Sequence, residues 1–195
     1  MYGKTSDGVS LVPRVKKTTG ILETAGGGKY REATLAGRIF AVANQAVVNV
    51  TVGMTATYTG LALCNPAGSG KNFAVIGFGC AAIIAVPTAA CTIGIMTGGG
   101  VGAATAVIAA RNRLSGGPSS KAYVDSAVVF TEAPVLEELI CTFHTGGVTT
   151  GLNPGVHVDL EQSVVVAPGF HVSPFASAIN DATFMFSWLW EEIDV

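Results

Sequence analysis

The sequence predicts an all-β fold: a jelly-roll-like β-sandwich with an extended N-terminal arm. Short apolar runs bounded by Gly, Pro, Asn or Ser recur along the chain, and helix-type periodicity is hard to find. The last apolar segment also alternates between its two faces. With about ten strands, two packed sheets are the natural architecture. We expect an arm over residues 1–32 and one sandwich domain over residues 33–195, which is long enough to bury a sizeable core.

The arm is the basic part of the chain. Residues 1–38 carry seven bases and three acids, a net charge of +4, whereas the remaining residues carry four bases and ten acids, a net charge of −6. Such a start predicts a tail that can lie on an acidic partner surface or on another copy, with a solvated flexible terminus as the alternative. Nucleic acid is not an expected partner, because the bases are sparse. The interaction residues expected in the arm are Lys4, Arg14, Lys16 and Lys17.

The strands are placed by apolar runs between turn-forming residues, such as those of "NPAGSGKN", "SGGPSS" and "NPG". In the last strand, Phe184, Phe186, Trp188 and Trp190 share one face, which predicts a strongly aromatic buried side. The predicted strands are Arg38–Val42, Val47–Val52, Thr57–Leu63, Asn72–Cys80, Ile83–Val86, Cys91–Met96, Thr105–Ala110, Ala122–Phe130, Leu136–Phe143, Val156–Leu160, Ser163–Ala167 and Thr183–Ile193.

The run from Phe73 to Met96 contains no charged residue and is long enough to cross a bilayer as a helix. Its texture favours strands, because Pro87 lies near its middle and glycines and β-branched residues interrupt it. Neither end carries the Trp or Tyr of an interfacial belt. We therefore interpret the run as strands and do not expect a membrane partner. An integral membrane protein is the alternative.

Composition and one strand predict contacts between subunits. Hydrophobic residues make up 49% of the chain and charged residues 12%, which is unusually apolar for a freely soluble monomer. Asn72–Cys80 is apolar on both faces, whereas one side of each sheet in a sandwich usually meets water. We infer that a neighbouring subunit covers the second face, and we expect a symmetric homo-oligomer with Phe73 and Val75 as interaction residues.

The cysteines and the N-terminus indicate where the chain is made. Its four cysteines, at positions 64, 80, 91 and 141, lie in apolar contexts without the spacing of a zinc site, which predicts buried free thiols. The first twenty residues contain no apolar segment of the length that a secretory signal needs. We expect synthesis in a cytoplasm.

Two motifs invite a chemical interpretation. Gly68-Ser69-Gly70-Lys71 resembles part of a phosphate-binding loop, but Asn65 and Asn72 stand where that loop needs a glycine and a Ser or Thr. The segment also leads into a strand, so we expect a hairpin turn. His157, Asp159 and Glu161 alternate on one strand face and are weak metal candidates, together with His171 from elsewhere in the chain. The wet face of an amphipathic strand is the simpler interpretation, and we expect no metal.

No catalytic constellation is recognisable. Serines lie in turns, and no Gly-x-Ser-x-Gly elbow is present. Glu191 and Glu192 are paired acids, but neighbours on a strand point to opposite faces, so we expect rim or solvent charges. We expect a non-enzymatic protein without a cofactor.

Four segments resemble the head decoration, or cement, proteins of tailed bacteriophages. They are "LCNPAGSGKNFAVIGF", "SGGPSSKAYVDSAVVFTEAPVLEEL", "VVVAPGFHVSP" and "FMFSWLWEEI", within residues Ala33 to Ile193. The resemblance implies a β-sandwich that is made in the infected bacterium and binds the capsid exterior of the virion, often as a trimer. Its partner would be the major capsid protein, whose contacts it stabilises. A receptor- or glycan-binding trimeric module of a phage tail or fibre is the alternative, which exposed aromatic residues would favour.

Overall fold

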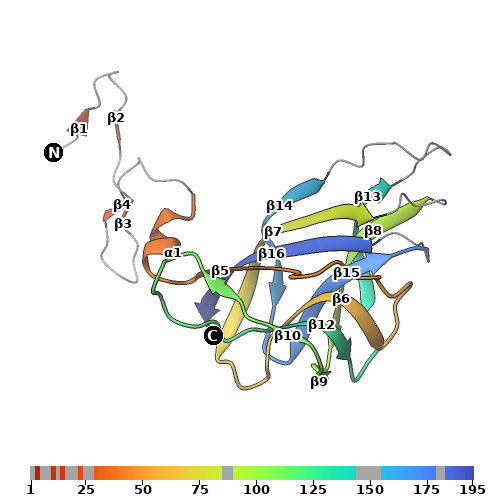
Figure 1. Cartoon of the computed structure of the whole chain (residues 1–195). Coiled ribbons are helices and arrows are strands. Elements are labelled where there is room, and N and C mark those ends of the chain that lie inside the picture. Colours follow the sequence, from red (N-terminus) through yellow and green to blue (C-terminus); the bar gives the residue numbers. More distant parts are fainter. Residues whose placement is uncertain are drawn as a thin grey trace.

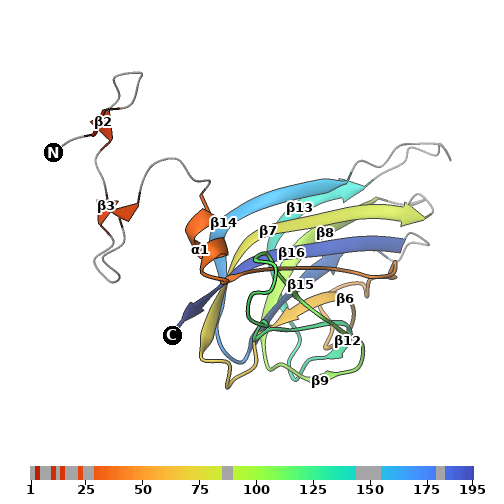
Figure 2. The same ribbon diagram turned by 60° about the vertical axis from the view of Figure 1, so that its left-hand side comes forward.

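The computed structural model describes residues 29–84, 90–143, 155–178 and 183–195, and four two-residue strands before them. The fold is nearly all β, and two antiparallel sheets pack face to face (Figures 1 and 2). The predicted β-sandwich is therefore confirmed, while its jelly-roll connectivity stays a prediction.

The first sheet has five strands in the order β11-β5-β16-β7-β14. The last strand of the chain, β16, lies at its centre, paired with β5 on one side and β7 on the other. The strands are β5 (Ile39–Ala43), β7 (Lys71–Ile84), β11 (Arg111–Asn112), β14 (Val156–Val166) and β16 (Thr183–Asp194).

The second sheet has seven strands in the order β10-β12-β6-β15-β8-β13, and β9 also pairs with β12. Its edge strand β13 and the edge strand β14 of the first sheet lie on the same side of the sandwich (Figure 1). The strands are β6 (Thr57–Cys64), β8 (Cys91–Gly99), β9 (Ala103–Ala104), β10 (Val107–Ile108), β12 (Tyr123–Val129), β13 (Val135–Phe143) and β15 (Phe170–Ala176).

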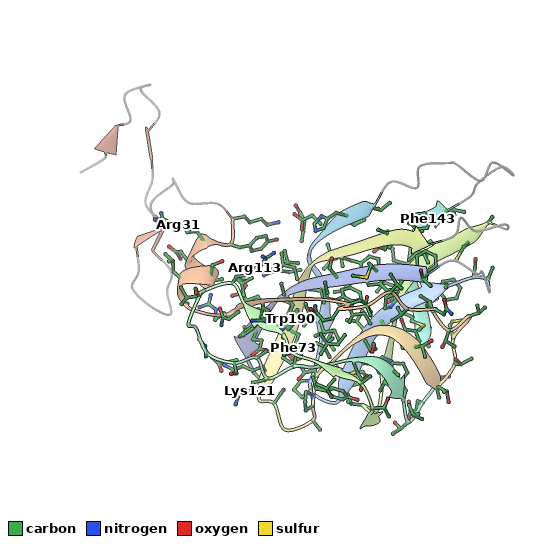
Figure 3. All side chains as sticks on the ribbon, viewed as in Figure 1. Arg31, Phe73, Arg113, Lys121, Phe143 and Trp190 are labelled. Atoms are coloured by element: carbon green, nitrogen blue, oxygen red, sulfur yellow. The ribbon has the colours of Figure 1, made fainter. Side chains whose placement is uncertain are left out.

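The main core fills the space between the sheets, and the aromatic face of β16 dominates it, as its alternation predicts. Trp188 and Trp190 are fully buried. Trp190 lies against Phe40, and also against Phe73, beside which Figure 3 shows it. The indole of Trp188 donates a hydrogen bond of 2.8 Å to the Leu61 carbonyl on the facing sheet. This bond, and the contact of Phe184 on β16 with Phe143 on β13 of the facing sheet, help to fix how the two layers face each other.

The second apolar face of Asn72–Cys80 is covered by the chain itself. The helix α1 (Arg31–Leu35) brings Ala33 beside Ile76, and Tyr30, Ile39 and Leu189 complete that cluster. Phe73 and Val75 point the other way and are fully buried between the sheets. The inference that a neighbouring subunit must cover this strand is therefore corrected, because an intrachain helix does so.

Several predicted strands have different boundaries. Asn72–Cys80 and the first two residues of Ile83–Val86 form the single strand β7, whose predicted continuation lies outside the described residues. The two segments predicted over 156–167 also merge, as β14. Val47–Val52 forms only an isolated bridge, from Val48 to Phe184. The strand β15 and the helix α1 were not predicted at all.

The apolar run from Phe73 to Met96 forms most of β7 and the first part of β8, apart from residues 85–89, which are not described. Among the described residues, no helix has the length and apolarity needed to cross a membrane.

The N-terminal segment contributes no described strand to either large sheet. β1 (Gly3–Lys4) pairs with β2 (Ser10–Leu11), and β3 (Arg14–Val15) pairs with β4 (Leu22–Glu23). Lys16 and Lys17 lie outside the described residues, as do the side chains of Lys4 and Arg14.

Candidate functional site

The segment Gly68-Ser69-Gly70-Lys71, which resembles part of a phosphate-binding loop, is a structural turn. Ser69 donates its backbone N–H to the Pro66 carbonyl, and Lys71 begins β7 and pairs with Asp194 at 2.5 Å. The turn leads into a strand, as predicted. It is not a hairpin, however, because β6 and β7 belong to different sheets. Asn65 is buried, and its side-chain amide donates to the Lys71 and Val166 carbonyls at 2.8 Å each, which ties this crossover to the turn after β14.

The three alternating polar residues of β14 lie exposed on the outer face of the five-stranded sheet. Asp159 accepts a hydrogen bond from the backbone N–H of Glu161, and Glu161 forms an ion pair with Lys29. His157 lies across β7, with its ring beside Gly77. The described residues hold no group of three His, Cys, Asp or Glu side chains that could bind a metal ion.

The fourth metal candidate, His171, belongs to the other sheet. It is fully buried on β15 in the seven-stranded sheet, and its ring stacks on Phe130 with centroids 3.5 Å apart and planes 3° from parallel. Neither ring nitrogen has a hydrogen-bond partner among the described residues. Desolvation by burial lowers the pKa of His171 to about 4, so the ring is neutral at pH 7.

The paired acids at the end of β16 are buried, which corrects the expectation of rim or solvent charges. They point to opposite sides, as predicted, and each is satisfied separately. Glu191 accepts from Arg38 at 2.8 Å and from the Gln162 side chain at 2.8 Å. Glu192 accepts from the Ser120 hydroxyl and the Lys121 backbone N–H. Their bonds join loops and strands, and the two carboxylates do not share a site.

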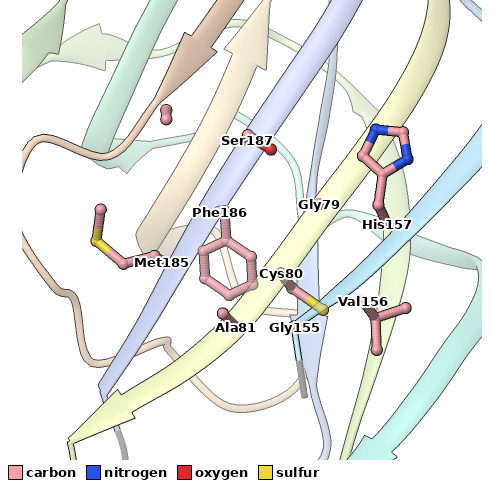
Figure 4. Close-up of a pocket in the computed structure, with 10 residues that line it drawn as sticks. Gly79, Cys80, Ala81, Gly155, Val156, His157, Met185, Phe186 and Ser187 are labelled. Atoms are coloured by element: carbon pink, nitrogen blue, oxygen red, sulfur yellow. The ribbon is translucent and has the colours of Figure 1, made fainter. Parts of the chain in front are cut away.

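A shallow depression of about 370 Å³ lies on the outer face of the five-stranded sheet (Figure 4). Small residues leave room for it: Gly79 of β7 lies opposite Ser187 of β16, and Ala81 lies opposite Met185. A Cβ atom at Gly79 would stand 2.5 Å from the Ser187 hydroxyl, so glycine lets that side chain lie against the sheet. The lining is mainly apolar, and His157 at its rim is the one titratable side chain besides the Cys80 thiol. The depression offers a contact surface more than a chemical site.

A second depression, of about 340 Å³, lies where β14 turns into β15. Glu137 of β13 lines it and accepts a hydrogen bond from Thr97. Val165 and Phe170, which line this depression, are exposed apolar side chains, and the edge strand β13 exposes Val135 and Leu139. An apolar surface on two neighbouring edge strands is typical of a protein contact.

The interaction residues predicted in the sandwich do not belong to this surface. Phe73 and Val75 have no exposed area, so neither can contact a partner of the folded chain. Sequence reasoning missed Leu139 and Val165 as exposed residues. Both lie on predicted strands, and only the sheet order shows that those strands are edges.

No protein-family model, no curated protein and no solved structure matches this chain.

Proposed function

We propose that this chain is a non-enzymatic structural protein of a phage virion, which binds the outside of the capsid and stabilises contacts between major capsid proteins. The observation that carries the proposal is the division of the chain. The two sheets close around their own core, while the described strands of the N-terminal segment pair only with one another. Such a segment is suited to bind a neighbouring protein. The sequence resemblance to cement proteins suggests that this neighbour is the major capsid protein.

The distribution of charge supports the same division of the chain into a binding segment and a sandwich. Residues 1–28 carry four bases and two acids, a net charge of +2, and the remaining residues carry seven bases and eleven acids, a net charge of −4. A basic segment on an acidic sandwich favours contact with an acidic surface, either of the capsid or of another copy. Binding to the assembled lattice stabilises that lattice by mass action.

The arm is tested by binding to capsids that lack this protein and are built from the major capsid protein of the same phage. The full chain is compared with a chain lacking residues 2–28 and with a variant in which Lys4, Arg14, Lys16 and Lys17 are alanine. We expect both changes to weaken binding by roughly tenfold or more, and the affinity of the full chain to fall with added salt. Unchanged capsid occupancy by both variants would contradict the arm's role.

Self-association is the second part of the proposal, and the exposed apolar residues of β13 and β14 support it. We propose a trimer in which this surface contacts another copy. Light scattering after size-exclusion chromatography should then give three times 19.8 kDa for the full chain. The double variant Leu139→Lys, Val165→Lys should be monomeric and still folded, because both side chains are exposed on the single chain. A monomeric wild-type chain would refute the trimer.

The receptor- or glycan-binding alternative receives less support. Tyr58, Trp188 and Trp190 are buried, so they cannot form a platform for sugar rings. Phe170 is the aromatic side chain that the described residues expose most, and it lies in the apolar surface already assigned to self-association. Binding of the full chain to a glycan array would reverse this preference.

A further inference from the structure

Two cysteines meet across the sandwich. Cys80 lies on β7 of the five-stranded sheet, between Phe186 and Val156 on its neighbouring strands (Figure 4). Cys141 lies on the edge strand β13 of the seven-stranded sheet. Their sulfur atoms are 3.7 Å apart, and both thiols are free. The pair therefore connects the two layers at a point where no backbone hydrogen bond can.

The two thiols differ in access. Cys80 is buried in the main core, whereas Cys141 is half-buried and packs against that core from the edge of the sheet. Cys141 is therefore the thiol that a dissolved oxidant reaches first, from the side of β13.

The two thiols also differ in acidity. The contact between the two sulfurs lowers the pKa of Cys141 and raises that of Cys80, and burial raises the pKa of Cys80 further. Thiolate is the attacking form in disulfide exchange. The accessible cysteine is thus also the more reactive one.

We propose that Cys80 and Cys141 form an oxidation site, in which a low-molecular-weight disulfide converts the two thiols into one intramolecular disulfide that joins the sheets. The Cys141 thiolate attacks one sulfur of oxidised glutathione and releases one glutathione thiolate, leaving a mixed disulfide on Cys141. The Cys80 thiol then loses its proton, attacks the Cys141 sulfur and releases the second glutathione. Two protein thiols are oxidised and one glutathione disulfide is reduced to two thiols, so electrons and protons balance.

The redox state of the compartment decides whether the two thiols or the disulfide persists. A reducing cytoplasm keeps such thiols reduced, and an oxidising exterior allows the disulfide to persist. The chain would fold with free thiols and gain its covalent link between the sheets afterwards. This site goes beyond the proposed virion role and does not depend on it, because the chemistry uses the isolated chain.

The test uses the purified full chain in mixtures of reduced and oxidised glutathione. We expect the free thiols to fall from four to two as the mixture becomes oxidising, and peptide mapping without reductant to link the segments that contain Cys80 and Cys141. The disulfide closes the loop between Cys80 and Cys141, which should raise the Tm by about 10 °C. Reductant should reverse both changes.

Single substitutions separate the two roles. Cys80→Ala should stop at a glutathione adduct on Cys141, Cys141→Ala should leave Cys80 unmodified, and the control Cys91→Ala should still form the link. Retention of four free thiols in the wild-type chain, a link through Cys64 or Cys91, or a disulfide between two chains would overturn the proposal. Capsid binding is unaffected by these outcomes, so failure here and failure of the proposed function are distinguishable.

Discussion

His171 shows how burial alone sets the charge of one residue. Its ring fills the same kind of space as a phenyl ring, stacked on Phe130 and without a polar partner in the described part of the chain. Because its folded pKa is about 4 and its ordinary value is 6.5, the unfolded chain binds a proton that the folded chain refuses. His171 therefore makes the free energy of unfolding fall as the pH falls from about 6.5 to about 4, by about 3 kcal/mol in total.

Replacing this residue with phenylalanine should remove that pH dependence. Between pH 7.5 and pH 5, His171→Phe should lose about 2 kcal/mol less stability than the wild type, because phenylalanine has no proton to bind. Urea unfolding at the two pH values measures the difference. His157→Ala, which changes an exposed histidine, is the matched control and should behave as the wild type. Equal pH dependence in wild type and His171→Phe would show that the buried ring does not titrate as described.

Asp125 marks the limit of what residue identity reveals. Its carboxylate is fully buried and accepts backbone N–H bonds from Thr105, Ala106 and Ala127, at 2.7 to 2.9 Å. These bonds hold the short strands β9 and β10 against β12. The sequence shows only one acid inside an apolar strand, and nothing in it identifies the two distant donors, Thr105 and Ala106.

At the scale of elements, the pairing of β8 with β13 depends on a glycine. The register of β13 shifts between Leu136 and Glu138 and again between Leu139 and Cys141, so the strand bulges toward its partner. A Cβ atom at Gly94 would stand 2.5 Å from the Glu138 carbonyl oxygen, which is backbone and cannot rotate away. Gly94 therefore permits the close approach that this bulge needs.

Gly94→Ala should consequently destabilise the chain by about 2 kcal/mol or more, through overpacking at a rigid contact. Gly68→Ala is the matched control, since a Cβ atom there meets nothing within 4 Å and the residue is exposed in a turn. Its effect should stay within about 0.5 kcal/mol. Thermal or urea unfolding compares the two variants, and equal losses would show that β13 adjusts without cost.

The elements that the sequence predicted well are those with a clear periodicity or clear ends. The alternation of β16 sets its buried face correctly, and turn residues bracket β5, β6 and β12 within two residues. The strand β15 was missed because Pro174 interrupts its run of strand-forming residues. The strand nevertheless pairs with β8 through that proline. The merged strand β14 was split because Glu161 and Gln162 adopt positive φ angles of 50° and 65° at its bulge, and a pattern of residue types does not reveal such a kink.

At the scale of the whole molecule, the helix α1 places the boundary between the arm and the sandwich closer to the N-terminus than predicted. It spans the predicted boundary at residue 32 and covers Ile76, so part of the predicted arm belongs to the folded sandwich. The candidate surface was equally out of reach of the sequence, because apolar residues on an edge strand and on a central strand look alike until the sheet order is known.

Two truncations test this boundary through stability. A chain without residues 2–28 should keep the wild-type Tm, because Tyr30 and Ala33 remain in their cluster. A chain without residues 2–35 should lose about 3 kcal/mol as Ile39 and Ile76 become exposed, which lowers the Tm by roughly 10 °C. Differential scanning calorimetry measures both. Equal Tm values for the two truncations would mean that α1 adds nothing to the fold.

The central position of β16 has a consequence for how the chain is made. Its neighbours β5 and β7 end at Ala43 and Ile84, long before β16 begins at Thr183, yet they pair with β16 and not with each other. During translation β5 can pair with β11 and β7 with β14, but the edge of each strand that pairs with β16 stays open until residues 183–194 have left the ribosome exit tunnel. Contacts between such distant segments also make folding slow. The open strand edges expose the nascent chain to aggregation until β16 pairs with them, and folding chaperones have that interval in which to act on it.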